Sequence, residues 1–467
     1  MAPTLTFAVR KQNQCWFPPV KPTPYELKPL SDIDDQQFLR FQVPFYFAYP
    51  YSPSMDGRDP CQVIKTTLAQ LLVHYYPFAG RLSEAPNKKL TVECTGEGVL
   101  FVEADADVKL QEISNKLQPP SPYSDLFLHE VPGLGEICHS PLMLIQVTRL
   151  SCGGFIFALR FNHTMTDALG FHQFLKAASE IARGAEAPSL LPIWERHLLN
   201  ADDPPHVSFS HYEYNNIPAT GSSSNSLNHL VNPPNKMIIQ SFFFGPNEIF
   251  ALRNHLPKSL RVVSSTFDIL TATLWRCRTA ALHLVPSEQV RVLCVVNGRN
   301  KFKPPLPEGH YGNVLAIPAA VSSVEDLCGN SLGYAVGLVR KAKLSVTKEY
   351  IKSVANLMVL EGKPLFQPVQ AATYIVSDIT KMGFQELDFG WGEPIYGGPA
   401  KIGGSLTFMA TFFMPGQNSQ GVKGVVVPVG LPPLAMEAFI VEVDKMIREV
   451  GMQESHDVSG ALGPPII

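Results

Sequence analysis

The sequence predicts an α/β fold in which two similar domains each contain a mixed β-sheet flanked by helices. Its 467 residues correspond to two or three domains of about 150 residues each. Hydrophobic residues make up 45% of the chain, which excludes wholesale disorder, and 41 prolines, well above the usual ~5%, argue against a helix bundle. Both halves also follow one order of patterns: a capped helix, then strands, then a hairpin that leads into a helix.

In the first half, the hydrophobic periodicity predicts two strands and a helix. Residues 5–9 alternate between apolar and polar side chains, and residues 42–48 form a second strand-like run. Asp59 followed by Pro60 is an N-cap and first-turn signal, so a helix is expected to begin there and to end before Pro77.

Two hairpins and a further helix are expected next. The hairpins pair residues 90–94 with 99–103, and residues 142–148 with 155–161. The second hairpin is the more apolar one, and its last strand runs directly into His163. The periodicity then predicts a helix over residues 168–183.

Periodicity is lost over residues 196–236, which predicts a crossover linker between domains at residues 1–195 and 237–467. In the second half we expect a strand at 237–244, a helix capped by Ser265, a strand at 290–296, a hairpin of 405–412 with 424–429, and a helix opened by Pro433. The hairpin of this half does not end on a histidine, so a single catalytic site is expected.

The composition excludes several classes of function. The net charge is only −3 and no basic stripe occurs, so a nucleic-acid partner is not expected. The eight cysteines are scattered without a Cys-x-x-Cys pair, which predicts neither a metal site nor a disulfide framework. The sequence contains no phosphate-binding glycine motif, so no nucleotide cofactor is predicted. Because the chain also lacks a signal peptide and any membrane-length apolar run, we expect a cytoplasmic protein without a membrane partner.

The strongest catalytic candidate is His163, which stands four residues before Asp167. A histidine at the end of an apolar strand lies at the sheet edge where α/β folds place functional groups. An imidazole with an ordinary pKa of about 6.5 can act as a general base near neutral pH. On spacing alone, an alternative has equal weight: His163 is a core histidine and Asp167 only the N-cap of the following helix.

A second motif, Asp388-Phe389-Gly390-Trp391-Gly392, is predicted to be structural. Two glycines around a tryptophan indicate a tight turn with positive φ. The carboxylate in front of them is expected to hold backbone groups or a cation.

A third motif is interpreted as a chance match. Residues 329–333 match Gly-x-Ser-x-Gly, the nucleophile motif of α/β-hydrolases, which requires a preceding strand and a later acid and histidine. Residues 324–327 do not have a buried strand pattern, and residues 330–343 are predicted to form one helix. The histidine that follows Ser331 is His456, in a polar stretch. A serine hydrolase is therefore disfavoured.

Taken together, HTMTD at 163–167 and DFGWG at 388–392 resemble the two signatures of the plant BAHD acyltransferases, which transfer acyl groups from coenzyme A thioesters. Further agreement extends along nearly the whole chain, at residues 30–34 (LSDID), 76–82 (YPFAGRL), 265–268 (STFD), 297–299 (NGR) and 311–313 (YGN). Within the family, residues 30–36 and 376–378 are similar to alcohol acyltransferases of fruit and flower volatiles, including benzyl alcohol benzoyltransferases.

The resemblance implies a chloramphenicol acetyltransferase-like fold with the active-site channel between the domains. It implies that His163 is the general base, that Asp167 pairs with Arg299 to hold the loop, and that DFGWG lies away from the chemistry. Ser265 and Thr266 are implied contacts of CoA. Many relatives carry a tryptophan upstream of DFGWG that helps to stabilise the oxyanion. Because this chain has VSDIT at residues 376–380, its oxyanion donor stays open.

The implied reaction joins the acyl group of acyl-CoA, a co-substrate, to a small alcohol, giving an ester and free CoA without a permanently bound cofactor or a metal. The resemblance also implies a monomer that acts in plant secondary metabolism. Cations available for the CoA phosphates are Lys258, Arg261, Lys301 and Lys303. The acyl group (acetyl, benzoyl or anthraniloyl) and the acceptor (an alcohol or an amine) stay open. The alternatives are an esterase or thioesterase, and a non-catalytic ligand-binding member of the fold, against which the intact motifs argue.

Overall fold

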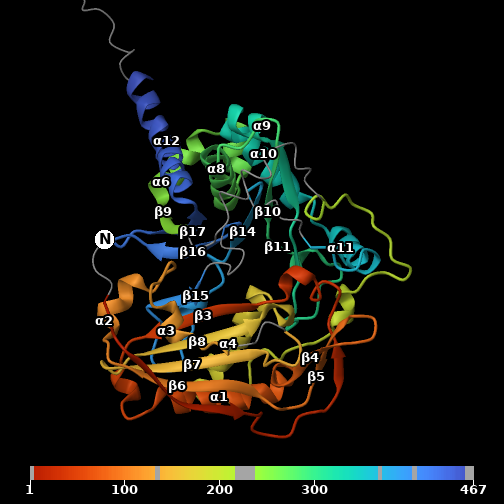
Figure 1. Ribbon diagram of the computed structural model, residues 1–467, viewed down its shortest axis with the longest axis vertical. Helices are drawn as coiled ribbons and strands as arrows, with labels where there is room; N and C mark the ends of the chain where they lie inside the picture. Colours follow the sequence, from red (N-terminus) through yellow and green to blue (C-terminus); the bar gives the residue numbers. More distant parts are fainter. Residues whose placement is uncertain (1–4, 132–136, 216–236, 366–370, 402–407, 458–467) are drawn as a thin grey trace, which may run out of the picture.

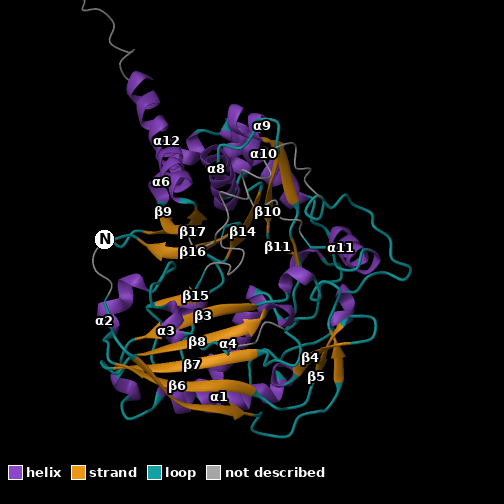
Figure 2. Ribbon diagram, viewed as in Figure 1, coloured by secondary structure: helices purple, strands orange, loops and turns teal. Residues whose placement is uncertain are grey.

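Two mixed sheets with helices on their faces build the two halves of the molecule (Figure 1; Figure 2). The computed structural model describes residues 5–131, 137–215, 237–365, 371–401 and 408–457, the last nine by backbone only. Within these residues each main sheet has six strands, and each contains both parallel and antiparallel pairs. The predicted α/β class is therefore confirmed.

The first sheet has the strand order β1-β6-β7-β8-β3-β15. Its strands are β1 (Val9–Phe17), β6 (Val99–Ala106), β7 (Met143–Leu150), β8 (Phe155–Asn162), β3 (Gln42–Tyr49) and β15 (Tyr396–Pro399). Helices α1 (Pro60–His74) and α4 (Ala168–Ala182) share a core with Phe45 and Phe47 of β3. Tyr46 points into a second core with α2 (Leu110–Ile113) and α3 (Ser124–Phe127). Because both faces are covered, the central strands of this sheet are largely apolar.

The second sheet has the order β13-β10-β14-β16-β17-β9. Its strands are β13 (Ala319–Ser323), β10 (Gln289–Cys294), β14 (Thr373–Asp378), β16 (Ala410–Gln417), β17 (Lys423–Leu431) and β9 (Ile238–Phe244). The helices that share the core of this sheet are α6 (Pro246–Asn254), α7 (Lys258–Val263), α8 (Thr266–Ala281), α9 (Val324–Gly329), α10 (Leu332–Leu344) and α12 (Pro433–Asp457). Trp275 of α8 is buried in their common core. In the described part of the chain, no helix combines the length and the apolar character needed to cross a membrane.

Smaller elements join the two halves. A three-stranded sheet contains β2 (Leu27–Pro29), β5 (Leu90–Glu93) and β4 (Arg81–Glu84), and a two-stranded one contains β11 (Val296–Asn297) and β12 (Leu315–Ala316). Helix α11 (Lys348–Leu360) packs beside the second of these. The 3-10 turns used below are η5 (His163–Met165), η6 (Arg196–Leu199), η8 (Arg299–Lys301) and η9 (Phe384–Glu386).

Local signals in the sequence predicted the helix ends well. Asp59 caps α1 by accepting a hydrogen bond from the backbone N–H of Cys61 at 3.2 Å. Ser265 and Asp268 form the predicted capping box of α8. The hairpin of β7 and β8 and the helix opened by Pro433 are also confirmed.

Strand pairing was predicted less well. The expected hairpin of residues 90–94 with 99–103 is wrong, because β5 pairs with β2 and β4 whereas β6 pairs with β1 and β7. The first strand begins at Val9 rather than at residue 5. The strand expected at 405–412 begins at Ala410, and part of its predicted range lies outside the described residues.

The two halves of the sequence exchange material. Strand β15 comes from the second half, yet it pairs with β3 at the edge of the first sheet, as Figure 1 shows. Phe389 and Trp391 also pack in the core of the first sheet. The predicted division at residues 196–236 does not describe this exchange. Residues 196–215 of that linker are ordered between the halves, and residues 216–236 lie outside the described chain.

Candidate active site

His163 lies where the sequence placed it, directly after β8, in the turn η5 that leads towards α4. Asn162 ends the strand because its side-chain Oδ1 accepts hydrogen bonds from the N–H and the hydroxyl of Thr164, at 3.1 and 2.7 Å. The backbone N–H of His163 donates to the carbonyl oxygen of Phe41 at 2.9 Å. The end of β8 and the backbone of Phe41 therefore fix the position of the His163 backbone, from which the imidazole extends.

The His163 side chain is suited to remain neutral. The residue is partly exposed, whereas its Nδ1 is buried, and the ring of Phe41 lies 5.4 Å away between centroids. Burial lowers the pKa of His163 below its ordinary value of 6.5, although its own backbone carbonyl, Asp167 and Asn313 act to raise it. A neutral imidazole at pH 7 can accept a proton.

The Asp167 carboxylate is paired with Arg299. Arg299 Nη1 and Nη2 lie 2.7 and 2.9 Å from the two carboxylate oxygens of Asp167. The same carboxylate caps α4 through the N–H of Gly170 at 3.0 Å and accepts the N–H of Val314 at 3.0 Å. Burial alone would raise the pKa of Asp167, but Arg299 and these N–H groups lower it below its usual value. Asp167 is thus both an N-cap and the partner of Arg299.

Further residues hold the backbone of the same turn, although sequence reasoning assigned them no role in the site. Asn313 Nδ2 donates to the carbonyl of His163 at 2.9 Å, and Arg196 Nη2 donates to that of Met165 at 2.7 Å. Both also bond to Asp34 Oδ1, at 2.9 and 2.7 Å. Asp34 and Asn313 lie in stretches that resemble the family, which was the available signal. Arg196 lies in a segment without hydrophobic periodicity, where no sequence pattern indicated a role in the site.

The DFGWG motif is a packed turn, as expected. Asp388 Oδ1 accepts the N–H groups of Gly390 and Gly392 at 2.7 and 2.8 Å, and both glycines have positive φ, +108° and +85°. Phe389 packs on Tyr49, and Trp391 packs edge-on against Phe155 at the start of β8.

His163 follows the opposite end of β8 from that contact. Phe389 also contacts Phe157, six residues before His163, so the DFGWG turn lies roughly 20 Å from His163 at about 3.3 Å per residue. The DFGWG turn is therefore remote from the His163 side chain.

Ser265 and Thr266 lie at the N-terminus of α8, where the helix dipole favours anions, and the Asp268 carboxylate of the capping box already accepts the N–H of Ser265. Ser265 is exposed, but its hydroxyl accepts the N–H of Asp268 at 3.2 Å as a helix cap. Among the cations considered for CoA, Arg261 already donates to two backbone carbonyls within its own turn. Lys258 is exposed on α7.

Residues 376–378, part of the stretch that stands in place of the tryptophan, end strand β14, and residues 379–380 follow it. Val376 is buried in the second sheet. Asp378 Oδ1 accepts both the N–H and the hydroxyl of Thr380, at 2.8 and 2.6 Å. These contacts engage the N–H and the hydroxyl of Thr380, whereas Ser377 of the same stretch is partly exposed.

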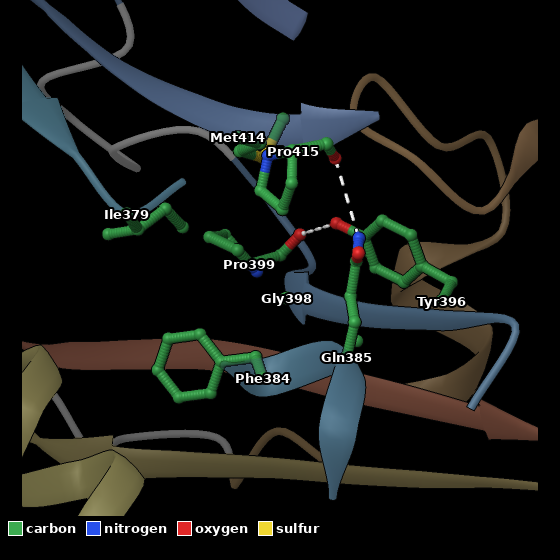
Figure 3. Close-up of a pocket in the computed structure, with 9 residues that line it drawn as sticks. Ile379, Phe384, Gln385, Tyr396, Gly398, Pro399, Met414 and Pro415 are labelled. Carbon is green, nitrogen blue, oxygen red and sulfur yellow. Dashed lines mark hydrogen bonds between the residues drawn. The ribbon is translucent and has the colours of Figure 1, made fainter. Parts of the chain in front are cut away.

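A small recess of about 10 Å³, the size of about one water molecule, lies where the two sheets meet. Its lining residues are Ile379, Phe384, Gln385, the four residues of β15, Met414 and Pro415 (Figure 3). Its polar groups are tied to one another, because Tyr396 donates to the carbonyl of Pro399 at 2.7 Å. Ring contacts lead from this wall towards His163, through Phe384, Phe171 and Phe161 in turn.

The hydrolase motif lacks its required context. Ser331 is the N-cap residue of α10 and follows the helix α9 rather than a strand. Another serine, Ser353, does contact His211, which in turn lies 3.0 Å from Glu213. Ser353 is 1% exposed, and its hydroxyl accepts two backbone N–H groups of the crossover segment. That array joins chain segments and has no access for a substrate.

One group of side chains has the composition of a metal site. Ligand atoms of Asp59, Cys61 and Glu103 lie within 4.8 Å of one another. Arg149 already bridges the two carboxylates, at 2.6 Å from Asp59 and 2.7 Å from Glu103. Burial raises the pKa of the Cys61 thiol, which disfavours the thiolate that binds metals. These residues therefore do not fit a cation.

Solved structures share this fold. Vinorine synthase superposes with a TM-score of 0.69 at 22% identity, over 94% of this chain and 98% of that one. F. graminearum TRI101, complexed with coenzyme A and deoxynivalenol, has a TM-score of 0.64 at 16% identity, over 88% and 96%. The expected architecture of two sheet-rich domains is thereby confirmed.

Closer relatives are known from sequence. Benzyl alcohol O-benzoyltransferase of Petunia hybrida is 54% identical over 445 residues, which cover 95% of each chain. Alcohol acyltransferase 16 of Actinidia chinensis var. chinensis is 50% identical over 449 residues, covering 96% of this chain and 95% of the relative. The model of the Transferase family matches residues 7–446. With its HTMTD turn held by Arg299 and its DFGWG turn in the first core, the chain belongs to this family, the BAHD acyltransferases.

Proposed function

We propose that His163 is the general base through which this acyl-CoA-dependent alcohol O-acyltransferase forms an ester. One observation carries the proposal: a partly exposed imidazole with a lowered pKa stands at the end of β8, in a turn whose Asp167 is paired with Arg299. A base that is neutral at pH 7 and rigidly placed has the properties that alcohol activation requires.

The reaction proceeds in a ternary complex of enzyme, acyl-CoA and alcohol. His163 removes the hydroxyl proton as the alcohol oxygen attacks the thioester carbonyl. The tetrahedral intermediate then collapses, its C–S bond breaks, and the imidazolium returns the proton to the CoA sulfur. General base catalysis of this kind contributes typically ~10²–10⁴-fold, and orientation of the two substrates supplies much of the remainder.

For the acceptor we propose an aromatic alcohol of the benzyl type, and for the donor a benzoyl or a smaller acyl-CoA. This choice is supported by the two relatives of Petunia hybrida and Nicotiana tabacum named benzyl alcohol O-benzoyltransferase, at 54% and 53% identity. One methylene changes discrimination by only about 1–3 kcal/mol, so a panel of substrates is needed.

We further propose that the CoA phosphates bind near Ser265 and Thr266 at the N-terminus of α8, with Lys258 as a nearby cation. The N–H groups of this helix end and its dipole favour negative charge. For the oxyanion we propose a backbone N–H or a water near His163 as the donor, because the Thr380 hydroxyl already donates to Asp378.

A cytoplasmic monomer of plant secondary metabolism is the setting we propose. The eight cysteines of the described chain form no disulfide, which is typical of proteins of the reducing cytosol and supports that location. Size-exclusion chromatography with light scattering tests the monomer, which a mass of twice 51.4 kDa would contradict.

The decisive experiment measures CoA thiol release from acetyl-CoA and benzoyl-CoA, with and without benzyl and aliphatic alcohols. His163→Ala is compared with His74→Ala, a control histidine at the end of α1. Release that needs the alcohol, yields the ester by mass and is lost only in His163→Ala would support the proposal. Release without alcohol that survives His163→Ala would instead favour a thioesterase, and ligand binding without any release would favour a non-catalytic member.

A further inference from the structure

A buried ion pair outside the reacting groups reaches the turn that carries His163. Arg196 Nη1 lies 2.7 Å from Asp34 Oδ1, and the side chains are 1% and 0% exposed. Asp34 lies between β2 and β3, whereas Arg196 opens η6 in the crossover segment. Two segments far apart in the sequence therefore meet beside the HTMTD turn.

The guanidinium of Arg196 uses its forked shape. While Nη1 contacts Asp34, Nη2 donates to the carbonyl oxygen of Met165 at 2.7 Å. The guanidinium also lies against the rings of Trp194 and Tyr311, at 4.4 and 4.9 Å from their centroids. Its place requires a glycine at position 312, because a Cβ atom there would lie 2.4 Å from Nη1. A lysine ammonium cannot reproduce two directed bonds and two ring contacts at once.

The Asp34 carboxylate extends this contact to the carbonyl of His163 itself. Its Oδ1 accepts the backbone N–H and the side-chain Nδ2 of Asn313, both at 2.9 Å. The same Nδ2 donates to the carbonyl oxygen of His163 at 2.9 Å. Asp34 Oδ2 is held by Ser31, through the hydroxyl at 2.6 Å and the N–H at 3.1 Å. One carboxylate thus anchors donors to the first and the third carbonyl of the turn.

Stability alone does not account for such an arrangement. A buried ion pair loses its hydration, and apolar side chains of similar volume are often as stabilising. Apolar side chains cannot, however, orient backbone carbonyls. Carbonyls fixed at both ends of a three-residue turn leave the Cα–Cβ bond of His163 little freedom, and catalysis is sensitive to misplacements of about 1 Å.

We propose that Asp34 and Arg196 are positioning residues for the acyl transfer, acting through the backbone of His163, Thr164 and Met165. This role rests on the proposed function of His163 as the base. Neither residue touches the substrate. They set the direction of the imidazole, and their loss is expected to lower kcat far more than it raises KM for either substrate.

The test compares Arg196→Lys, Arg196→Met and Asp34→Asn with a matched control, Arg291→Lys. Arg291 is equally buried and also donates to backbone carbonyls, those of Tyr212 and Asn215 at 2.8 and 2.9 Å, but it lies on β10 in the second sheet. For each variant, kcat and both KM values are measured on the folded fraction, and the free energy of unfolding is measured by urea denaturation.

We expect Arg196→Lys to keep the ion pair and much of the stability while kcat falls by roughly 10–100-fold, the scale of a misplacement of about 1 Å. In Arg196→Met and Asp34→Asn, kcat should fall at least as far. In the double variant kcat should be no lower than in the worse single variant, because the two residues act as one unit. Arg291→Lys should lose stability without this loss of kcat.

The opposite pattern would overturn the inference. If Arg196→Lys and Arg291→Lys lose similar stability and both keep wild-type kcat, Arg196 only holds the fold together. Additive effects of Arg196→Met and Asp34→Asn on kcat would overturn the claim that the two residues act as one unit. In either case His163→Ala tests the proposed function separately. If His163→Ala is inactive while the Arg196 variants remain active, the inference about Arg196 fails and the proposed function stands.

Discussion

The HTMTD and DFGWG turns both contain an aspartate that accepts backbone N–H groups, and they lie near opposite ends of β8. The Asp388 carboxylate binds N–H groups of its own turn, and the Phe389 and Trp391 side chains of that turn pack in the core of the first sheet. The Asp167 carboxylate binds Arg299 and Val314 from the other half of the chain as well. The same local chemistry therefore serves two purposes, and the partners distant in sequence distinguish them.

This difference has a physical basis in the interactions that hold each turn in place. The DFGWG turn is held by burial of its rings, so its position follows from packing. His163 is partly exposed, and burial alone cannot fix its ring. Its turn is instead held by directed bonds from Asp34, Arg196, Arg299 and Asn313, which restrict the backbone without covering the ring.

The largest expected effect is a loss of activity on substitution in the HTMTD turn. His163→Ala should lower kcat by about 10²–10⁴-fold, the contribution of general base catalysis, with little change in the free energy of unfolding. Steady-state kinetics with benzyl alcohol and benzoyl-CoA, together with thermal unfolding, measure both quantities. An alanine variant with more than about a tenth of wild-type kcat would contradict the role of His163 as base.

The next effect addresses the ion pair of the HTMTD turn. Arg299→Met leaves the buried Asp167 carboxylate without its cation, which should cost about 3–5 kcal/mol of stability and reduce kcat as the turn relaxes. Since the pKa of Asp167 is lowered in the wild type, the stability that this group contributes is present above its unfolded pKa and is lost as pH falls through the folded value. The stability difference between the wild type and Arg299→Met should therefore shrink as pH falls through that value, and urea denaturation at several pH values measures it. A difference that does not change with pH would contradict the stabilising role of this pair.

Asp388→Ala tests the opposite turn. Two hydrogen bonds to Gly390 and Gly392 disappear, so the free energy of unfolding should fall by about 1–3 kcal/mol. Because the turn lies far from His163, kcat of the folded enzyme should stay within a factor of two. Urea denaturation and kinetics at low temperature check this, and a kcat loss as large as that of Arg299→Met would remove the proposed contrast.

The smallest effect is the pH dependence of the wild type. Burial lowers the pKa of His163, and the neutral ring is the active form, so kcat/KM should rise with pH through a value below 6.5 and level off above it. Stability linked to this group is present above 6.5 and is lost as pH falls through the folded pKa. The profile of kcat/KM from about pH 4.5 to about pH 8, which brackets the ordinary value, measures it. A midpoint above about 7 would contradict a desolvated ring.

The sequence was most informative where local rules operate. Capping signals at Asp59 and Ser265 located helix starts, because an N-cap bonds only to residues two or three positions later. The apolar hairpin that ends at His163 was equally local. The hairpin expected at residues 90–103 failed, since alternation identifies strands but not their partners, and here the two strands enter different sheets.

By itself, then, the sequence determined the α/β class, the helix ends, the apolar strand in front of His163, and a resemblance that named Asp167 and Arg299 as partners. Only the tertiary structure decided that β15 joins the first sheet, and that Asp34 and Arg196 meet beside the HTMTD turn. The reason is physical: caps and periodicity depend on residues within one turn or strand, whereas a buried ion pair depends on how distant segments pack. No local pattern records that geometry.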